Sequence, residues 1–308
     1  MRARSRTVAQ VGVASCIVGM IAAVFLVGRA LTQEVVALRG RSHASVEGIA
    51  HAEGQSSASH SSLSCQPIYG GLWSSVGAQQ INGPGLFCLT DDLIWSGSAS
   101  TDYPVTFTSS AIGATFDLNG YSITCPDGTC DGWGIRLAGG RDILIENGTI
   151  HGFGDGDSLD NAGAIANGIF TGDGATFVTI RDLVLSNNRA GVGLGNNADN
   201  TDIVDNTFLD SAFVDIESVT SGRYTIRNNV FMSPSVTMGA NVELQYASDA
   251  LVTNNQFHGA PGSGVLAVDC GSSSTVKMRN NVIEPQGDTD GGVSLGFSSN
   301  CSDQGGNF

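Results

Sequence analysis

The sequence Ile226-Arg-Asn-Asn-Val-Phe231 recurs, with small changes, along the second half of the chain. Its third position always holds Asn or Asp, and successive copies lie 35, 23, 23, 26 and 26 residues apart. Repeats of about 20 to 50 residues indicate a solenoid, and alternating apolar residues without a helical period indicate β-strands. The chain is therefore predicted to form stacked β-coils. The third-position residues are Asn147, Asp182, Asp205, Asn228, Asn254 and Asn280.

Each predicted coil contains three short strands, and each strand contributes one column of inward-facing apolar residues. Successive side chains of a strand point to opposite faces, so alternate residues are expected to face the core. Three such columns make a dry core between parallel strands about 4.8 Å apart. The predicted inward residues are Ile135, Val192, Val214, Ile216, Val242, Leu244, Val265, Val293 and Leu295 in first strands, Ile145, Ile180, Ile203, Ile226, Val252 and Met278 in second strands, and Ile150, Leu185, Phe208, Phe231, Phe257 and Ile283 in third strands.

The Asn and Asp residues of the repeat have a mechanical explanation. A tight turn between two strands requires a residue that tolerates left-handed backbone dihedrals, as Asn and Gly do. The next position is Asn in four successive coils, at Asn206, Asn229, Asn255 and Asn281. Stacked amides can hydrogen-bond from coil to coil as a ladder, so these residues are interpreted as structural.

The N-terminal part of the chain does not share the repeat. Three Arg residues precede an uncharged run from Thr7 to Gly28, which is typical of a secretory signal peptide or an uncleaved membrane anchor. A small, polar stretch follows and is typical of a flexible tether. A solenoid also needs an atypical terminal unit to cover its open end. The predicted parts are a leader at 1–38, a linker at 39–64, an N-terminal cap at 65–114 and the β-coils at 115–308.

Composition and cysteine content limit the partners and the compartment. The 308 residues carry a net charge of −15, so no nucleic-acid partner is expected. Six Cys residues follow the leader, and an even number there indicates disulfides in an oxidising compartment. Cys125 and Cys130 close a short turn, and Cys270 and Cys301 follow matching strands, so they could link the last two coils. The protein is predicted to be exported to the periplasm, cell surface or extracellular space.

The repeat resembles that of the pectate-lyase-like superfamily, including its NosD-like and alginate-epimerase-like branches. The likeness rests on Phe116-Asp-Leu-Asn-Gly-Tyr-Ser-Ile123, on Asn147-Gly-Thr-Ile150 with its repeats, and on Pro84-Gly-Leu-Phe-Cys-Leu-Thr90. It covers about residues 80–300. It implies an all-β fold, a single-stranded right-handed parallel β-helix of about seven coils with an N-terminal cap. The superfamily contains lyases, hydrolases, epimerases and non-enzymatic adhesins, so the fold does not select one activity.

The outward face of the first strands is the predicted functional surface, a groove for a chain-like ligand. Alternation places Asp215 and Glu243 in one outward column, with Glu217 and Gln245 in a second column two residues further on. Close carboxylates raise one another's pKa or bind a hard cation such as Ca²⁺. A carboxyl pair also serves as acid and base in glycoside hydrolysis. The predicted outward column is Arg136, Phe170, Gly193, Asp215, Glu243, Leu266 and Ser294.

Other residues complete the hypothesis. Arg189, Arg223 and His258 are expected on loops beside the groove, where any of the three could supply the base that a lyase or epimerase needs. Asp155, Asp157 and Asp160 in the long loop after the first coil resemble part of a calcium loop. The assigned catalytic residues are Asp215, Glu217, Glu243, His258 and Arg223, and the assigned substrate-binding residues are Arg136, Phe170, Gln245 and Arg189.

Two functions remain open at this point. One is an exported or membrane-tethered protein that binds extracellular polysaccharide and cleaves or modifies it, as a lyase-like or hydrolase-like enzyme. The other is a non-catalytic, adhesin-like or structural surface protein. Both predict a polysaccharide partner and a membrane contact through the leader, and Ca²⁺ is the one cofactor that the acidic residues suggest.

Overall fold

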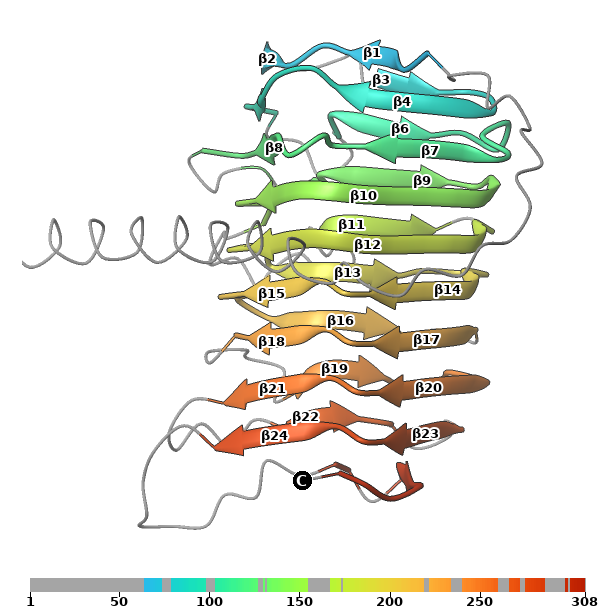
Figure 1. The fold of residues 1–308 in the computed structure, drawn as a ribbon, viewed down its shortest axis with the longest axis vertical. Coiled ribbons are helices and arrows are strands. Elements are labelled where there is room, and N and C mark those ends of the chain that lie inside the picture. The colour runs from blue at the N-terminus through green and yellow to red at the C-terminus, as the bar shows by residue number, and fades with distance from the viewer. Residues whose placement is uncertain are drawn as a thin grey trace, which may run out of the picture. The chain divides into compact units, whose positions relative to one another are not determined.

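The computed structural model describes residues 64–73, 79–97, 103–126, 130, 132–154, 167–172, 174–218, 222–233, 240–259, 266–271, 275–285, 297–298 and 300–307. The predicted leader lies outside these residues, as does the predicted linker apart from Ser64. Within the described residues, no helix is long and apolar enough to cross a membrane. The described part is built from parallel strands stacked rung upon rung (Figure 1).

The first strands of the coils form an eight-stranded parallel sheet, here called the first-strand sheet. Seven turns of the chain join these eight strands, and the prediction of about seven coils is confirmed. Each strand pairs in parallel with the strand of the next coil. Its members are β3 (Gln79–Ile81), β6 (Val105–Phe107), β9 (Ile135–Ala138), β11 (Asn167–Gly172), β13 (Ala190–Leu194), β16 (Val214–Ser218), β19 (Ala240–Leu244) and β22 (Leu266–Asp269).

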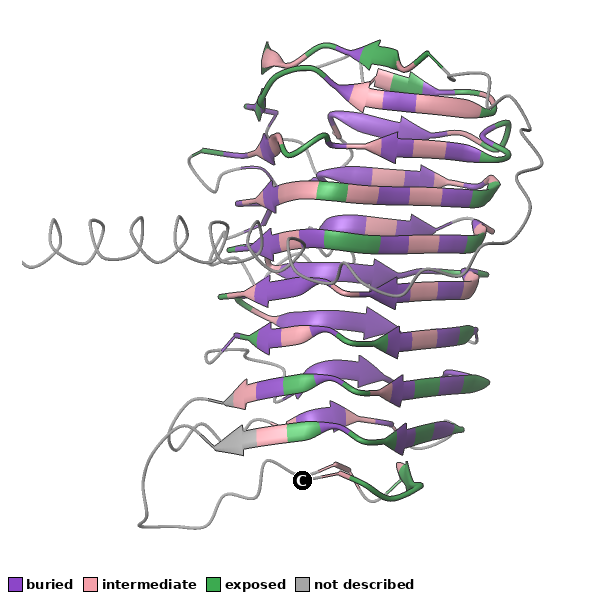
Figure 2. Cartoon of the chain, viewed as in Figure 1, coloured by how far each residue is buried: buried purple, intermediate pink, exposed green. Residues whose placement is uncertain are grey.

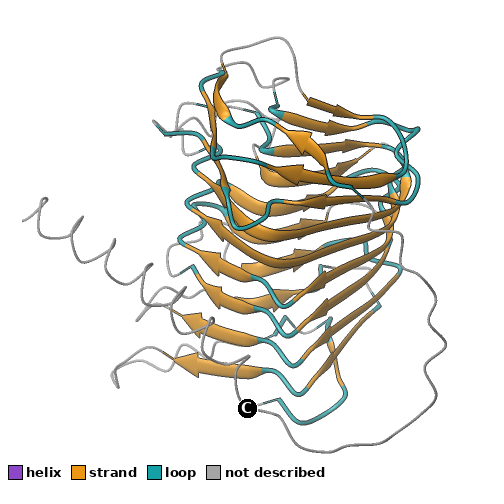
Figure 3. Cartoon of the chain, turned by 45° about the horizontal axis from the view of Figure 1, so that its top comes forward, coloured by secondary structure: helices purple, strands orange, loops and turns teal. Residues whose placement is uncertain are grey.

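The second and third strands form one 17-stranded sheet, here called the large sheet. Two of its strands, β10 (Arg141–His151) and β12 (Thr176–Ser186), are long enough to span both rows, and Figure 3 shows the strands wrapped around a common interior. The second-strand row also contains β1 (Gln66–Ile68), β4 (Gly85–Leu89), β7 (Ala114–Asp117), β14 (Asp199–Val204), β17 (Arg223–Arg227), β20 (Asp249–Thr253), β23 (Val276–Arg279) and β25 (Ser302–Asp303). The third-strand row also contains β2 (Gly71–Trp73), β5 (Leu93–Trp95), β8 (Ser122–Thr124), β15 (Thr207–Leu209), β18 (Val230–Met232), β21 (Gln256–Gly259) and β24 (Val282–Pro285).

The core lies between the two sheets and follows the predicted columns. Along the second-strand row, buried residues alternate with partly or fully exposed ones (Figure 2). The predicted inward residues are buried wherever the structure describes them, except Ile283, which is only partly buried. Phe208, Phe231 and Phe257 stack with ring centroids 4.9 and 4.6 Å apart. Val265, Val293 and Leu295 lie outside the described residues.

The turns between second and third strands confirm the interpretation of the repeat. The third-position residues all have a left-handed backbone, with φ between 53° at Asp182 and 62° at Asn147. The next Asn residues form the predicted ladder, in which the Asn206 amide donates to Asn229 at 3.1 Å and Asn229 donates to Asn255 at 3.1 Å. The ladder continues through Asn281 to Asn307. It satisfies polar groups that burial would otherwise leave without partners.

The segment predicted as a cap continues the same stacking. Its strands β4 and β6 pair in parallel with β7 and β9 of the following coil. These strands add coils of the same three-strand plan, so the sheets show no boundary at residue 115. Three disulfides link neighbouring parts of the coils, at Cys65–Cys88, Cys125–Cys130 and Cys270–Cys301. The last two are the pairs that the sequence suggested.

Candidate functional site

The strongest concentration of perturbed carboxyl groups lies on the outer side of the first-strand sheet. Glu217 of β16 is in register with Glu243 of β19, and Glu243 is in register with Asp269 of β22. On the other side, Glu217 is in register with Gly193. Glu217 and Glu243, here called the acidic pair, are therefore separated by one strand spacing, about 4.8 Å between backbones.

This register corrects the predicted outward column. The sequence predicted Asp215 between Gly193 and Glu243, whereas Glu217 occupies that place. The prediction aligned Phe213 with Gly191, but Val214 pairs with Ala190, which shifts β16 by two residues. The Arg189 carbonyl accepts hydrogen bonds from the backbone N–H groups of both Phe213 and Val214. The chain entering β16 therefore contains two residues more than the predicted alignment allowed.

Asp215 lies on β16, two residues before Glu217, and is fully buried. Its carboxylate accepts a hydrogen bond from the Ser233 hydroxyl at 2.5 Å and one from the Asn241 amide at 2.8 Å. Burial raises the pKa of Asp215 to about 6, although these hydrogen bonds oppose the increase. Its two oxygens are engaged by the protein, so the structure gives Asp215 a supporting position beside the pair.

Glu243 combines burial with an oxygen that has no protein partner. The side-chain amide of Gln245 donates a hydrogen bond to its Oε1 atom. Its Oε2 atom is buried and has no hydrogen-bond partner among the described residues. Burial raises the pKa of Glu243, and the charge of Asp269 raises it further, while the bond from Gln245 lowers it. A buried oxygen of this kind is costly unless a ligand or water satisfies it.

Glu217 has a pKa close to neutral pH, which suits a group that donates and accepts a proton there. Burial raises the pKa of Glu217 to about 7, and the charge of Glu243 adds to the increase. The nearby positive charge of Arg189 opposes it. Arg189 itself packs against the ring of Phe213, with its guanidinium carbon 4.8 Å from the ring centroid. Arg189 and Gln245 thus lie beside the acidic pair, whereas the sequence predicted Gln245 in one column with Glu217.

These raised pKa values predict that the folded protein loses stability between pH 5 and pH 8. Asp215 and Glu217 titrate near 6 and 7 when folded, and at usual values of 3.8 and 4.5 when unfolded. The folded state therefore binds more protons in this range, and stability falls as pH rises. Since one pKa unit corresponds to about 1.4 kcal/mol, the full shift of each group is worth on the order of 3 kcal/mol, of which about 1 kcal/mol for Asp215 and about 2 kcal/mol for Glu217 are lost above pH 5. Urea unfolding at pH 5, 6.5 and 8 measures this loss.

The Glu217→Gln variant provides the control for this measurement. It is expected to show a shallower fall in unfolding free energy across the same range. Asp199, whose pKa is lowered mainly by its hydrogen bond with Arg223, affects stability only at more acidic pH. A wild-type protein that becomes more stable from pH 5 to pH 8 would contradict the assignment of the buried carboxyl groups.

The opposite half of the same outward column is aromatic and cationic. Phe170 stacks on Trp133 with centroids 4.7 Å apart, and Trp133 stacks on Tyr103 at 6.0 Å. The Arg136 guanidinium lies 5.2 Å from the Tyr103 ring centroid and donates a hydrogen bond to its hydroxyl at 2.9 Å. These three rings are here called the aromatic stack. Arg136 and Phe170 therefore occupy the predicted column, whereas the packing partner Tyr103 was missed.

Glycines let the aromatic stack approach the acidic pair. Phe170 pairs with Gly193, which pairs with Glu217, so the backbones of Phe170 and Glu217 lie two strand spacings, about 10 Å, apart. A methyl group on Gly195 would lie 2.6 Å from the Phe170 ring, and one on Gly172 would lie 2.4 Å from it. The Phe170 side chain therefore fills space that only glycine leaves open.

Two predicted catalytic residues lie on the other sheet. Arg223 begins β17 in the second-strand row and forms an ion pair with Asp199, with 2.7 Å between Nη2 and Oδ2. His258 lies in β21 of the third-strand row, in register with Glu284. Both were predicted on loops beside the first-strand groove, and this placement is wrong, because both belong to strands of the large sheet.

The metal hypothesis finds no ligand cluster in the described part of the chain. No group of three or more His, Cys, Asp or Glu there could hold a metal ion. Of the three carboxylates predicted to converge, only Glu217 and Glu243 stand in register. The oxygens of Asp215 are occupied by hydrogen bonds, so three carboxylates are not available to bind Ca²⁺ there. Asp155, Asp157 and Asp160 lie outside the described residues, so the calcium loop stays a prediction.

Comparisons with known proteins agree with this architecture. The family model described as "Right handed beta helix region" matches residues 167–304. A comparison with curated protein sequences finds no match. Among solved structures, an alginate lyase from Paenibacillus sp. str. FPU-7 is similar, with a TM-score of 0.51 and 14% identity. The similarity covers 78% of this chain and 91% of the lyase.

Two further structures are similar over much of the chain. The Dettilon tailspike protein (gp208) is 14% identical with a TM-score of 0.42, covering 79% of this chain and 60% of the tailspike. The surface protein and adhesin PfbA of Streptococcus pneumoniae is 11% identical with a TM-score of 0.40, covering 71% of this chain and 77% of PfbA. At such identities, what the comparison with the lyase shows is a common fold.

Proposed function

The chain is a right-handed parallel β-helix protein, and from this premise we propose that it is an exported protein that binds polysaccharide along its first-strand sheet and hydrolyses it at the acidic pair. Export is supported by the three disulfides, which persist in oxidising compartments. A polysaccharide partner is supported by the aromatic stack and by the fold shared with a protein named as an alginate lyase.

One observation carries the catalytic part of the proposal. Glu217 and Glu243 stand in register on adjacent strands, and their environments differ. Two carboxyl groups about 5 to 5.5 Å apart are typical of retaining glycosidases, whereas inverting enzymes separate them by about 6.5 to 9.5 Å. The backbones of Glu217 and Glu243 are one strand spacing, about 4.8 Å, apart, and side chains that extend in parallel from them would hold their carboxyl groups at a similar separation, nearer to the retaining geometry. The proposed reaction is therefore hydrolysis with retention at the anomeric carbon.

The two side chains take different roles in this proposal. Glu217, with a pKa of about 7, is protonated in a large fraction of molecules near neutral pH and is the general acid. Glu243 is the nucleophile, because Gln245 holds its Oε1 atom and leaves Oε2 without a protein partner. As Oε2 attacks the anomeric carbon, the glycosidic C–O bond breaks and the leaving oxygen takes the proton of Glu217. Glu217 then removes a proton from water, which displaces Glu243.

The aromatic stack gives the substrate a direction. Sugar rings present C–H faces that pack on aromatic rings, and the Phe170 ring lies in the same outward column as the acidic pair. A chain that lies along the column would contact Trp133 and Phe170 before reaching the carboxyl groups. Arg136 adds a positive charge at that end, which favours a polysaccharide with acidic groups.

A non-catalytic, adhesin-like function is the second candidate. It is favoured by the small exposed fractions of the acidic pair, 6% for Glu217 and 4% for Glu243. Such burial restricts the approach of a substrate and suits a buried polar pair whose role is structural. On this reading, the protein retains polysaccharide without changing it.

A glycan panel tests the function and separates the candidates. The full chain is incubated with acidic and neutral polysaccharides, and both retention and products are recorded. Hydrolysis is expected to release reducing ends without the ultraviolet-absorbing double bond that a lyase creates. Retention without product would support the adhesin-like candidate, and ultraviolet-absorbing product would refute hydrolysis. Failure to bind or alter any glycan would refute both candidates.

A further inference from the structure

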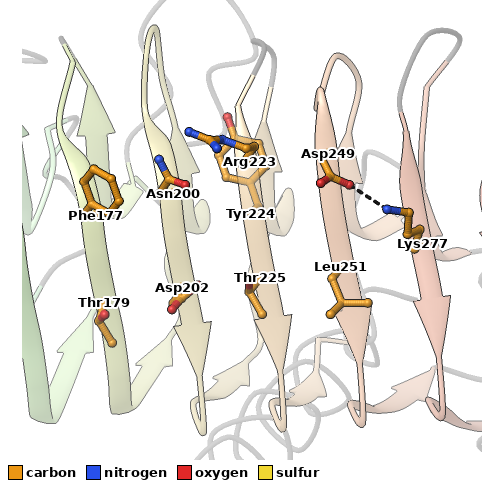
Figure 4. Close-up of a pocket in the computed structure, with 10 residues that line it drawn as sticks. All are labelled: Phe177, Thr179, Asn200, Asp202, Arg223, Tyr224, Thr225, Asp249, Leu251 and Lys277. Atoms are coloured by element: carbon orange, nitrogen blue, oxygen red, sulfur yellow. Dashed lines mark hydrogen bonds and ion pairs between the residues drawn. The ribbon is translucent and has the colours of Figure 1, made fainter.

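A concave surface lies on the second-strand row of the large sheet, away from the acidic pair. Its volume is about 570 Å³, and it crosses five successive strands, β12, β14, β17, β20 and β23 (Figure 4). We call it the large-sheet groove. Its side chains form two rows along the solenoid axis. One row is Phe177, Asn200, Arg223 and Asp249, and the other is Thr179, Asp202, Thr225, Leu251 and Lys277.

Phe177 is the unusual residue of this groove. Its side chain is 53% exposed, and its backbone has a φ of 54°. The residues at the same level in the neighbouring coils are Asp142 and Asn200, with φ of 56° and 53°. Asp and Asn tolerate this left-handed conformation, whereas a bulky aromatic residue there is an outlier. A strained, exposed aromatic side chain is poorly explained by stability and points to function.

Most of the other lining residues are polar, and their charges are largely paired. Arg223 pairs with Asp199, and Lys277 pairs with Asp249 at 3.1 Å. The side chain of Asp202 is partly buried, and its carboxylate has no ion pair or hydrogen bond with any other described residue. It is in register with Thr179 on one side and Thr225 on the other, so a carboxylate lies between two hydroxyl groups. Leu251, 38% exposed, adds apolar surface beyond Thr225.

We propose that the large-sheet groove is a binding site for a neutral oligosaccharide, with Phe177 as the stacking platform and Asp202 as the acceptor for sugar hydroxyls. An exposed ring beside hydroxyl, amide and carboxylate groups matches the alternating apolar faces and hydroxyl edges of a sugar. Arg223 and Lys277 are both in ion pairs, so the unpaired charge among the described lining residues is the carboxylate of Asp202. A negative charge there disfavours an acidic glycan. The site shares a ligand class with the proposed function but none of its residues.

The Phe177→Asn variant tests the proposal without endangering the fold. Asn is the residue found at the same level in the next coil, Asn200, so the variant is expected to fold and to melt at the wild-type temperature or above it. Binding of a soluble neutral glucan and a neutral galactomannan is measured by affinity electrophoresis and calorimetry. Loss of the ring is expected to weaken binding of the better ligand by about tenfold or more.

Further variants make the outcome decisive. Asp202→Asn is expected to weaken the same binding, because the amide is a poorer acceptor. Met232→Asn replaces another exposed apolar residue on a different row and serves as the matched control. Unchanged neutral-glycan affinity in a well-folded Phe177→Asn protein would overturn the proposal, as would a wild-type protein that binds no neutral glycan. Because Glu217→Gln alters only the other sheet, hydrolysis and this binding can fail independently.

Discussion

Replacement of Glu217 by Gln is expected to lower kcat for polysaccharide hydrolysis by about 10²- to 10⁴-fold, because the variant lacks a proton to donate to the leaving oxygen. Glu243→Gln is expected to reduce the rate at least as much, since an amide cannot form the covalent glycosyl intermediate. Both changes preserve the shape of the side chain, so the variants are expected still to bind the polysaccharide at the aromatic stack. Reducing-end release by the full chain, with retention measured in parallel, checks this prediction.

The pH profile adds a readout that a structural role would not produce. Wild-type activity is expected to fall as pH rises through about 7, where Glu217 loses its proton, and again at acidic pH, where Glu243 gains one. Asp182→Asn is the matched control, because Asp182 is an exposed carboxylate on the large sheet whose left-handed backbone suits Asn equally. Wild-type rates in both acidic-pair variants would refute hydrolysis at this site.

Replacement of Asn229 by Ala is expected to destabilise the fold by about 4 kcal/mol. The Asn229 side chain accepts from the backbone and the amide of Asn206, and donates to the Ile203 carbonyl and to Asn255. Each lost hydrogen bond costs about 1 kcal/mol, because its buried partner has no access to water. For a domain of this size, Tm is expected to fall by roughly 8 to 16 °C, measured by calorimetry.

Asn196→Ala is the control for the ladder, because Asn196 is exposed and has no left-handed backbone. It is expected to change the unfolding free energy by about 0.5 kcal/mol or less. An Asn229→Ala protein as stable as this control would show that the ladder contributes nothing to the fold.

Much of the fold follows from local rules that act on each repeat separately. Ile203, Ile226 and Val252 are inward because alternation and burial dictate it. Asn228 and Asn254 occupy left-handed turns because few other residues tolerate them. These constraints are local to a few residues, so the sequence predicts the three-strand coil and the turn. It also suggests the Cys125–Cys130 disulfide, which closes a short turn, and the Cys270–Cys301 disulfide, whose cysteines follow matching strands.

The functional residues depended on register, which alternation does not encode. A shift of two residues keeps every inward side chain inward, so the pattern of β16 fits equally well with Asp215 or Glu217 opposite Glu243. The chain entering the strand selected Glu217, through the two hydrogen bonds to the Arg189 carbonyl. Arg223 and His258 were misplaced for a related reason. Alternation does not show where a loop ends and the next strand begins, so residues predicted on loops beside the first-strand sheet belong to strands of the large sheet.

The sequence by itself determined the repeating coil, its aliphatic core and its Asn ladder, because each depends on spacing within one repeat. Only the tertiary structure decided which residues of different coils become neighbours. The acidic pair, the contact of Phe170 with Gly195 and the exposure of Phe177 beside Asp202 all arise between coils. Their physical cause is the stacking of strands at one constant spacing. The length of each loop then sets which residues of successive strands stand in register on one surface.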